Sequence, residues 1–171
     1  MPASMPAFTP PNPDYAARTR DSFARQPAMA MVGASITALE PGFCEVTLPH
    51  RADLTQQHGF IHGGVTGMIA DSASGYAGFT LMPADSSPLT AEYKINMLNP
   101  AHGEKLIARA RVIKPGKTLV ITQCDVFAVK DGKESLCATM LQTLMVMRGV
   151  ADGKRARGAP EKSARDSRKI H

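Results

Sequence analysis

The sequence contains no tryptophan, and only six phenylalanines and three tyrosines occur among its 171 residues. So few aromatic side chains give no indication of a pocket for an aryl substrate. The chain also lacks any run of about 18 apolar residues, which excludes a membrane-spanning helix. The N-terminal stretch MPASMPAFTPPNPDY has neither a basic start nor an apolar block, so we expect no signal peptide.

Cysteine is sparse as well. Cys44, Cys124 and Cys137 are widely separated, and no two of them form a Cys-x-x-Cys pair. An odd, scattered set in a chain without an export signal indicates free thiols and a cytoplasmic protein. No spacing typical of metal ligands occurs, so we expect neither a metal nor another cofactor.

Most of the net positive charge lies at the C-terminus. The net charge is +5, and after Arg148 seven basic residues stand against three acidic ones, which leaves about +1 for the rest of the chain. A nucleic-acid-binding module usually carries its basic surface on its folded part, so we expect no nucleic-acid partner. We interpret the tail as a flexible, solubilising extension, with a weak anion-binding arm as the alternative.

Length and composition predict one domain with two flanking segments. A chain of 171 residues is large enough for one hydrophobic core, which we place in residues 13–148. Residues 1–12 are rich in proline and alanine and are predicted to be disordered. Residues 149–171 form the basic flexible tail.

Apolar periodicity and turn residues predict the order of the elements. A short amphipathic helix over residues 13–25 precedes a two-stranded hairpin over residues 31–48, whose turn contains Pro41 and Gly42. After a loop comes a long helix over residues 64–79. Four strands then follow as an antiparallel meander, over residues 89–98, 105–114, 118–129 and 134–147. One long helix against one antiparallel sheet is an α+β fold.

The predicted long helix is unusual because small residues dominate one of its faces. Its apolar residues recur at helical spacing, but glycines and alanines follow one another along the same segment. Each glycine inside a helix costs about 1 kcal/mol relative to alanine. So slim a face indicates that a sheet wraps closely around the helix.

Asp71 is the single acidic residue within this helix. Its neighbours Ile69, Ala70, Ser72 and Ala73 carry no charge. A carboxylate that is partly withdrawn from water becomes a better base or nucleophile, so we regard Asp71 as the candidate catalytic residue. The alternative is a solvated carboxylate on an exposed stripe of the helix.

The turn before the helix completes a recognisable motif. His62-Gly63-Gly64, followed by Asp71 nine residues after the histidine, resembles the hotdog-fold acyl-CoA thioesterases of the PaaI type. The segments AEYKINMLNPA and VIKPGKT resemble the next two strands of that family, and the resemblance covers roughly residues 35–147. It implies a sheet wrapped around the central helix, and a homodimer or dimer of dimers (a homotetramer) with its sites at the dimer interface.

The resemblance also implies roles for individual residues. Asp71 is the catalytic base or nucleophile, and the backbone N–H of Gly63 polarises the thioester carbonyl. Gln56, fifteen residues before the acid, and Thr90, on the following strand, orient the water or the carbonyl. Some relatives carry a hydroxyl one helical turn after the acid, where this chain has Gly75.

Helix geometry adds an argument that is independent of the resemblance. Gly63 and Asp71 are eight residues apart, which is about 12 Å along a helix. One thioester carbon cannot touch both ends of that span, so a site that uses both groups requires two chains. The amide at a helix N-terminus is unpaired and lies at the positive end of the helix dipole, which suits it to an oxyanion.

Other polar residues near the motif have more than one interpretation. His62 is either a catalytic acid or, as we prefer, a ring that fixes the turn. Gly64 and His58 are candidates for substrate binding. Lys114 and Lys117 flank a predicted turn and are candidates for the CoA phosphates, although either is also consistent with a solvated strand end.

We therefore expect an acyl-CoA thioesterase, and the methionine-rich last strand with Tyr76 and Phe79 favours a medium-chain aliphatic acyl group. One alternative is a hotdog enoyl-CoA hydratase that uses Asp53 and His58, whose five-residue spacing matches that class. The intervening LTQQ lacks the Asn-Pro of those enzymes. The other alternative is a non-catalytic acyl-CoA-binding protein, because a fold alone does not determine function.

Overall fold

The structure is a computed structural model that describes residues 7–150 and residue 152. Within these residues lie the helices α1 (Tyr15–Ala24), α2 (Pro27–Val32) and α3 (Gly63–Phe79), and a 3₁₀ turn at Ala52–Leu54. None of the described helices is both long and apolar enough to cross a membrane. α3 is the predicted central helix, and it begins one residue earlier than expected.

Helix α2 was not predicted. A strand was expected to begin at Met31, but this residue lies in the last turn of α2. Pro27 opens the helix at a position where its missing N–H is not needed. Gly33 ends the helix in the left-handed conformation, with φ 77°. The first strand therefore begins only at Ser35.

Six strands form one sheet in which every neighbouring pair is antiparallel. The strands are β1 (Ser35–Glu40), β2 (Phe43–Pro49), β3 (Ser86–Met97), β4 (Lys105–Lys114), β5 (Leu119–Lys130) and β6 (Lys133–Arg148). Their order across the sheet is β1-β2-β4-β5-β6-β3. The predicted α+β class is therefore confirmed.

The predicted meander of the last four strands is wrong in one respect. β4, β5 and β6 pair in sequence order, but β3 pairs with β6 and lies at the edge of the sheet. β4 pairs instead with β2, where Cys44 lies opposite Ala110. Local patterns predict where strands occur, whereas their partners depend on which faces are buried against the rest of the fold. β3 suits an edge because most of its residues are exposed.

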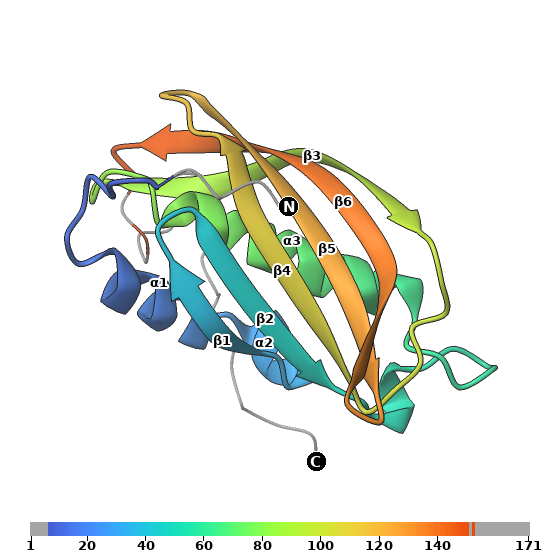
Figure 1. Cartoon of the computed structure of the whole chain (residues 1–171). Helices are drawn as coiled ribbons and strands as arrows, with labels where there is room; N and C mark the ends of the chain where they lie inside the picture. The colour runs from blue at the N-terminus through green and yellow to red at the C-terminus, as the bar shows by residue number, and fades with distance from the viewer. Residues whose placement is uncertain (1–6, 151, 153–171) are drawn as a thin grey trace, which may run out of the picture.

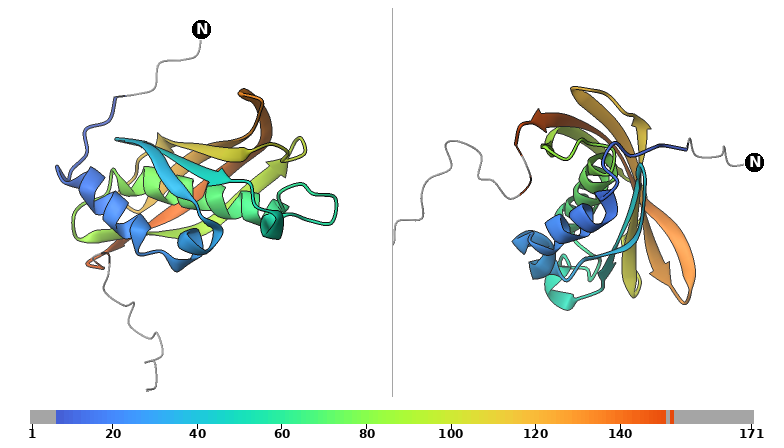
Figure 2. Two further views of the ribbon diagram at one scale, coloured as in Figure 1. Left: turned by 90° about the horizontal axis from the view of Figure 1, so that it is seen from below. Right: turned by 90° about the vertical axis from the view of Figure 1, so that its left-hand side faces the viewer.

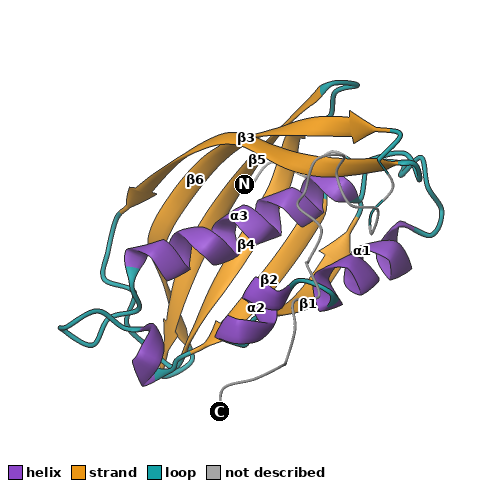
Figure 3. Cartoon of the chain, turned by 180° about the vertical axis from the view of Figure 1, so that it is seen from behind, coloured by secondary structure: helices purple, strands orange, loops and turns teal. Residues whose placement is uncertain are grey.

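The sheet curves around α3, as the small residues of this helix predicted. All three helices lie on one side of the sheet, which is seen edge-on in Figure 2. α3 runs across the concave face, and α1 and α2 lie beside it near β1 and β2 (Figures 1 and 3). The inward side of α3 consists of Ile69, Ala70, Ala73 and Ala77, all fully buried.

Gly78 shows how closely the helix approaches the sheet. A Cβ atom at this position would lie 2.4 Å from Cδ1 of Leu144 on β6 and 3.5 Å from Cγ1 of Val120 on β5. Glycine is therefore required by the close approach of the two layers. By contrast, a Cβ at Gly67 on the same helix would meet no atom within 4 Å.

Helix α1 is fastened to the C-terminal end of α3 by Arg18. The guanidinium of Arg18 donates hydrogen bonds to the carbonyl oxygens of Phe79 (3.0 Å), Met82 (2.9 Å) and Pro83 (2.7 Å). It also lies 4.0 Å from the centre of the Phe79 ring. A cation at a helix C-terminus is stabilised by the helix dipole, so α1 has a defined position against α3.

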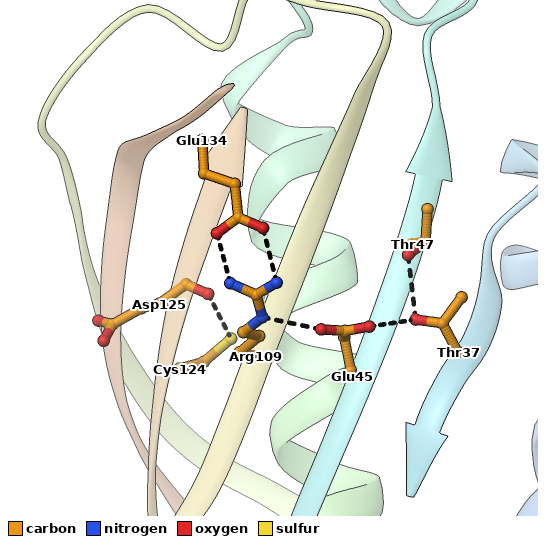
Figure 4. Close-up of polar contacts among 7 residues, drawn as sticks. All are labelled: Thr37, Glu45, Thr47, Arg109, Cys124, Asp125 and Glu134. Carbon is orange, nitrogen blue, oxygen red and sulfur yellow. Dashed lines mark hydrogen bonds and ion pairs between the residues drawn. The ribbon is translucent and has the colours of Figure 1, made fainter. Parts of the chain in front are cut away.

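The outer face of the sheet carries a charged network across several strands (Figure 4). Arg109 on β4 binds Glu134 on β6 through two hydrogen bonds of 2.6 and 2.7 Å, and it binds Glu45 on β2 at 2.8 Å. The same carboxylate of Glu45 accepts a hydrogen bond from Thr37 on β1. The Arg109 guanidinium lowers the pKa of Glu134. The bidentate bond between Arg109 and Glu134 joins β4 to β6, which are not adjacent in the sheet.

Two parts of the predicted domain organisation lie largely beyond the described residues. The expected disordered segment includes residues 1–6, which the structure does not describe, whereas Phe8 packs against the hydrophobic core. Of the predicted tail, only residues 149–150 and Asp152 are described. The boundaries at residues 13 and 148 therefore stay predictions.

The close contact at Gly78 predicts a difference in stability between two alanine variants. Gly78→Ala and Gly67→Ala both gain about 1 kcal/mol of helix propensity, but only the first overpacks the core. We expect Gly78→Ala to have a free energy of unfolding about 1–3 kcal/mol below that of Gly67→Ala. Urea unfolding measures the difference, and equal stabilities would contradict this description of the interface.

Candidate active site

Asp71 lies half-buried on α3, and two side chains from the sheet hold one of its oxygens. Its Oδ1 atom accepts a hydrogen bond of 2.8 Å from the hydroxyl of Thr90 on β3. The same atom accepts a bond of 2.7 Å from Nε2 of Gln142 on β6, which also donates to the Thr90 hydroxyl at 2.9 Å. Since both donors use Oδ1, the Oδ2 atom has no donor among the described residues. Thr90 was expected to orient the water or the carbonyl, and its hydrogen bond to Asp71 was not predicted.

Gln142 was not predicted. Its side chain is 1% exposed, and its Oε1 atom is buried without a partner among the described residues. An unsatisfied buried acceptor costs about 1–3 kcal/mol. A signal was present in the sequence, because Gln142 interrupts the inward-facing row Met140, Leu144 and Val146 of the last strand. A lone amide in an apolar row indicates a polar partner on the opposing helix.

A cavity of about 190 Å³ opens beside Asp71, and we refer to it as the Asp71 chamber. It contains no basic side chain from the described residues. It is lined by Asp71, Ser72, Gly75 and Tyr76 of α3, by Thr90, Ser87 and Pro88 of β3, and by Ser22, Gln26 and Asp152. Residues before α2 and Asp152, which follows β6, therefore both contribute to its wall.

Gly63 lines a different cavity, at the N-terminal end of α3. This cavity of about 210 Å³ is shared with Gln56, Thr66, Met97 and Cys137, among other residues, and has no lining residue in common with the Asp71 chamber. The Gly63 amide has no acceptor among the described residues, as expected for the first residue of a helix. The structure therefore brings Gln56 close to Gly63 but keeps both apart from Asp71.

His62 caps the N-terminus of α3. Its Nδ1 atom accepts the backbone N–H of Gly64 at 2.9 Å, and its carbonyl accepts the N–H of Val65. An accepting Nδ1 carries no proton, so the ring is held in one tautomer. This geometry supports the structural interpretation of His62. It also means that the Gly64 amide is already engaged, whereas the Gly63 amide is not.

Gln56 belongs to a tight turn that precedes the cap. Its backbone N–H donates to the carbonyl of Phe60 at 2.8 Å, and its Oε1 atom accepts the backbone N–H of His58. The side-chain NH₂ group of Gln56 is the part that these bonds leave available as a donor. His58 itself is exposed on the turn.

The residue pair of the hydratase alternative is not assembled within the chain. Asp53 forms an exposed ion pair with Arg51, with a distance of 2.5 Å from its Oδ2 atom to Nη2, and this bond lowers the pKa of Asp53. No hydrogen bond joins Asp53 to His58 in the part of the chain that the structure describes. These contacts therefore disfavour an acid–histidine pair at this position.

Lys114 and Lys117 lie at the β4–β5 turn and are exposed. Neither lines the Asp71 chamber or the cavity at Gly63. The structure therefore does not bring them together with the other candidate residues of the same chain.

The cysteines are unsuited to nucleophilic catalysis. All three are free and buried. Burial raises the pKa of the Cys137 thiol, which lines the Gly63 cavity, to about 11, and that of Cys44 to about 12. Both groups remain protonated near neutral pH, whereas the thiolate is the nucleophile. Asp71 is the stronger candidate.

Comparison with known proteins identifies the family of this chain. Residues 58–135 match the family model described as the thioesterase superfamily. A crystal structure of a thioesterase family protein from Silicibacter pomeroyi is 50% identical, with a TM-score of 0.78, over 79% of this chain and 99% of that chain.

Two curated relatives extend the comparison. A provisionally named esterase of Saccharolobus solfataricus is 35% identical over 117 residues, which cover 68% of this chain and 75% of the relative. Human acyl-coenzyme A thioesterase 13 is 30% identical over 103 residues, 58% of this chain and 71% of the relative. The resemblance stated from the motif is confirmed: the chain belongs to the thioesterase superfamily, has its hotdog fold, and is a thioester hydrolase.

Proposed function

We propose that the protein is an acyl-CoA thioesterase that hydrolyses an acyl-CoA to the free acid and CoA, with Asp71 as its catalytic carboxylate. The observation that carries the proposal is the pair of hydrogen bonds from Thr90 and Gln142 to Oδ1 of Asp71. They fix the carboxylate beside a cavity and leave its Oδ2 atom for substrate or water. A relative named acyl-coenzyme A thioesterase supports the choice of CoA thioesters.

The chemistry follows one of two routes. In the first, Oδ2 of Asp71 takes a proton from water as the water oxygen attacks the thioester carbon; the C–S bond of the resulting tetrahedral intermediate then breaks, and the departing CoA thiolate takes up a proton. In the second, the carboxylate attacks directly, the CoA thiolate leaves, and water hydrolyses the resulting mixed anhydride. In both routes negative charge develops on the thioester oxygen. The free amide of Gly63 is suited to stabilising this charge, at about 2.7–4 kcal/mol for one such donor.

Both groups act on one substrate only if they come from two chains. The span from Gly63 to Asp71 is about 12 Å along the helix. A homodimer, or a dimer of dimers, would bring the Asp71 of one chain to the Gly63 of its twin. The edge strand β3 supports this assembly, because no described strand pairs with its outer edge and Leu89, Tyr93 and Met97 on it are about half exposed.

The remaining candidate residues take supporting roles in this scheme. The NH₂ group of Gln56 would donate to the thioester carbonyl beside the Gly63 amide. His62 would hold that amide in place through the helix cap. Lys114 and Lys117 would bind the CoA phosphates from outside the site. Three free thiols fit a protein of the reducing cytoplasm.

Replacement of Asp71 by asparagine tests the proposal. Asparagine keeps an Oδ1 acceptor for Thr90 and Gln142 but cannot act as a base or nucleophile at neutral pH. We expect thiol release from acyl-CoA to fall roughly 100- to 10,000-fold in Asp71→Asn, with little change in folding. The matched control is Asp53→Asn, which should keep its activity. Release of thiol by Asp71→Asn at the normal rate would refute the role, whereas hydration of an enoyl-CoA without thiol release by the wild type would favour the hydratase pair.

The role of Gln142 is tested by Gln142→Leu, which keeps the side-chain size and removes the donor to Asp71. A hydrogen bond to a charged group contributes about 1.5–3 kcal/mol, so we expect kcat to fall roughly 10- to 100-fold. Because the variant also loses the unpartnered Oε1 atom, its free energy of unfolding should stay within about 1 kcal/mol of the wild-type value. The control is Gln123→Leu on β5, whose side chain accepts a bond from Arg111. Equal kcat values for the two variants would show that Gln142 is only structural.

A further inference from the structure

Three polar atoms in the core between α3 and the sheet have no hydrogen-bond partner among the described residues. They are Oγ of Ser74 on α3, Oγ1 of Thr122 on β5 and Oε1 of Gln142 on β6. Ser74 and Thr122 are 0% exposed, and Gln142 is 1% exposed. We refer to these three residues as the inner polar cluster. None of them lines the Asp71 chamber or the cavity at Gly63.

The pairing of the strands places the members of this cluster together. Thr122 lies directly opposite Gln142 in the register of β5 and β6, and both side chains are buried. Residues that are opposite each other on antiparallel strands have Cβ atoms about 4.5–5.5 Å apart. The next buried pair along the same two strands lies against Gly78. Ser74, one helical turn before Gly78, therefore faces the same strands.

The Ser74 hydroxyl has only a weak neighbour on β5. The thiol of Cys124, two residues beyond Thr122, faces this hydroxyl. Burial raises the pKa of Cys124, so the thiol stays protonated, and a thiol is a weak hydrogen-bonding group. The hydroxyls of Ser74 and Thr122 therefore both remain available as donors.

The bonds of Gln142 determine which end of its amide needs a partner. Both protons of the Nε2 group are used, one by Asp71 and one by Thr90. The Oε1 atom keeps its lone pairs, which only a donor can satisfy. If the amide turned by half a rotation, Oε1 would face the carboxylate of Asp71, and the two acceptors would repel each other. The orientation of the amide is therefore stabilised by a donor near Oε1.

A single water molecule would satisfy all three members of the cluster. The hydroxyls of Ser74 and Thr122 can donate to the water oxygen, and the water can donate to Oε1 of Gln142. Buried waters in proteins typically make about three hydrogen bonds to polar groups that otherwise lack partners. Such a bridge is nearly as favourable in enthalpy as a direct hydrogen bond.

We propose that one water molecule is bound at the inner polar cluster and holds the Gln142 amide with its NH₂ group toward Asp71. Ser74 and Thr122 are then positioning residues, because they act on the carboxylate only through the water and Gln142. The inference rests on the proposed catalytic role of Asp71. It assigns a part in the reaction to two hydroxyls that lie in the core, outside both cavities.

Thr122→Val tests the positioning role, because valine keeps the branched shape and removes the hydroxyl. We expect kcat for thiol release from acyl-CoA to fall roughly 3- to 10-fold, the effect of one neutral hydrogen bond, with little change in KM. Ser74→Ala should act in the same direction, whereas Thr122→Ser keeps a hydroxyl and should retain most of the activity. The matched control is Thr19→Val on α1, which removes a hydroxyl that is equally buried and has no partner among the described residues.

The dependence of kcat on pH separates this role from a general loss of packing. Without the water the Gln142 amide can turn, and Oε1 beside Asp71 disfavours the ionised carboxylate. The acid limb of the profile should therefore move to higher pH in Thr122→Val, by roughly 0.5–1 pH unit. The other titratable residues that line the chamber with Asp71 are Tyr76 and Asp152, and this variant keeps both. The control variant should keep the wild-type profile.

A high-resolution crystal structure of the wild type tests the water directly. We expect density for one water within hydrogen-bonding distance of Oγ of Ser74, Oγ1 of Thr122 and Oε1 of Gln142. A dry space between these atoms would overturn the inference.

The outcomes separate the inference from the function on which it rests. If the wild type hydrolyses acyl-CoA but Thr122→Val and Thr19→Val have equal kcat values and equal pH profiles, the inference is wrong and the thioesterase proposal stands. If the folded wild type hydrolyses no acyl-CoA, the proposed function fails and with it the positioning role, whereas density for the water would still support the binding site.

Discussion

The length of helix between Gly63 and Asp71 is the constraint on which the proposed site depends. Eight residues of α-helix separate an unpaired amide from a carboxylate by about 12 Å. The two groups line cavities that share no residue, so a single chain presents two half-sites. The proposed dimer follows from this separation, and the exposed edge strand β3 offers a surface for it. In the proposed mechanism, the Gly63 amide of one copy therefore acts together with the Asp71 carboxylate of another.

The slim face of α3 and the hydrogen bonds of Asp71 have a common origin. Small residues such as Ala70, Ala73 and Gly78 allow the sheet to approach the helix closely. Because the sheet lies so close to the helix, Thr90 on β3 and Gln142 on β6 both reach the same oxygen of Asp71. The Oε1 atom of Gln142 is buried without a partner among the described residues. This arrangement costs free energy of folding, and packing alone does not require it. Polar groups at this depth are typical of a site whose geometry matters for chemistry.

Much of the fold could be predicted because its signals are local. Helical periodicity predicted α3, and alternation with Pro-Gly and Asp-Gly turns predicted β4, β5 and β6 close to their observed bounds. The motif singled out Asp71, and the family resemblance pointed to Thr90, as candidates for the site. The pairing of β3 with β6, the hydrogen bonds of Gln142 and the contribution of α1 to the wall of the Asp71 chamber could not be predicted in this way. Each depends on contacts between segments far apart in the chain, which local pattern does not encode.

Subunit complementation tests the shared site most directly. Gly63→Pro removes the amide proton, and proline fits the first helical position after an extended residue such as His62, with ψ 137°. This variant and Asp71→Asn should each be inactive alone. After subunits are exchanged at equal concentrations, half of the dimers are mixed and each holds one intact site, so about a quarter of wild-type thiol release should return. A mixture as inactive as its components would contradict a site built from two chains.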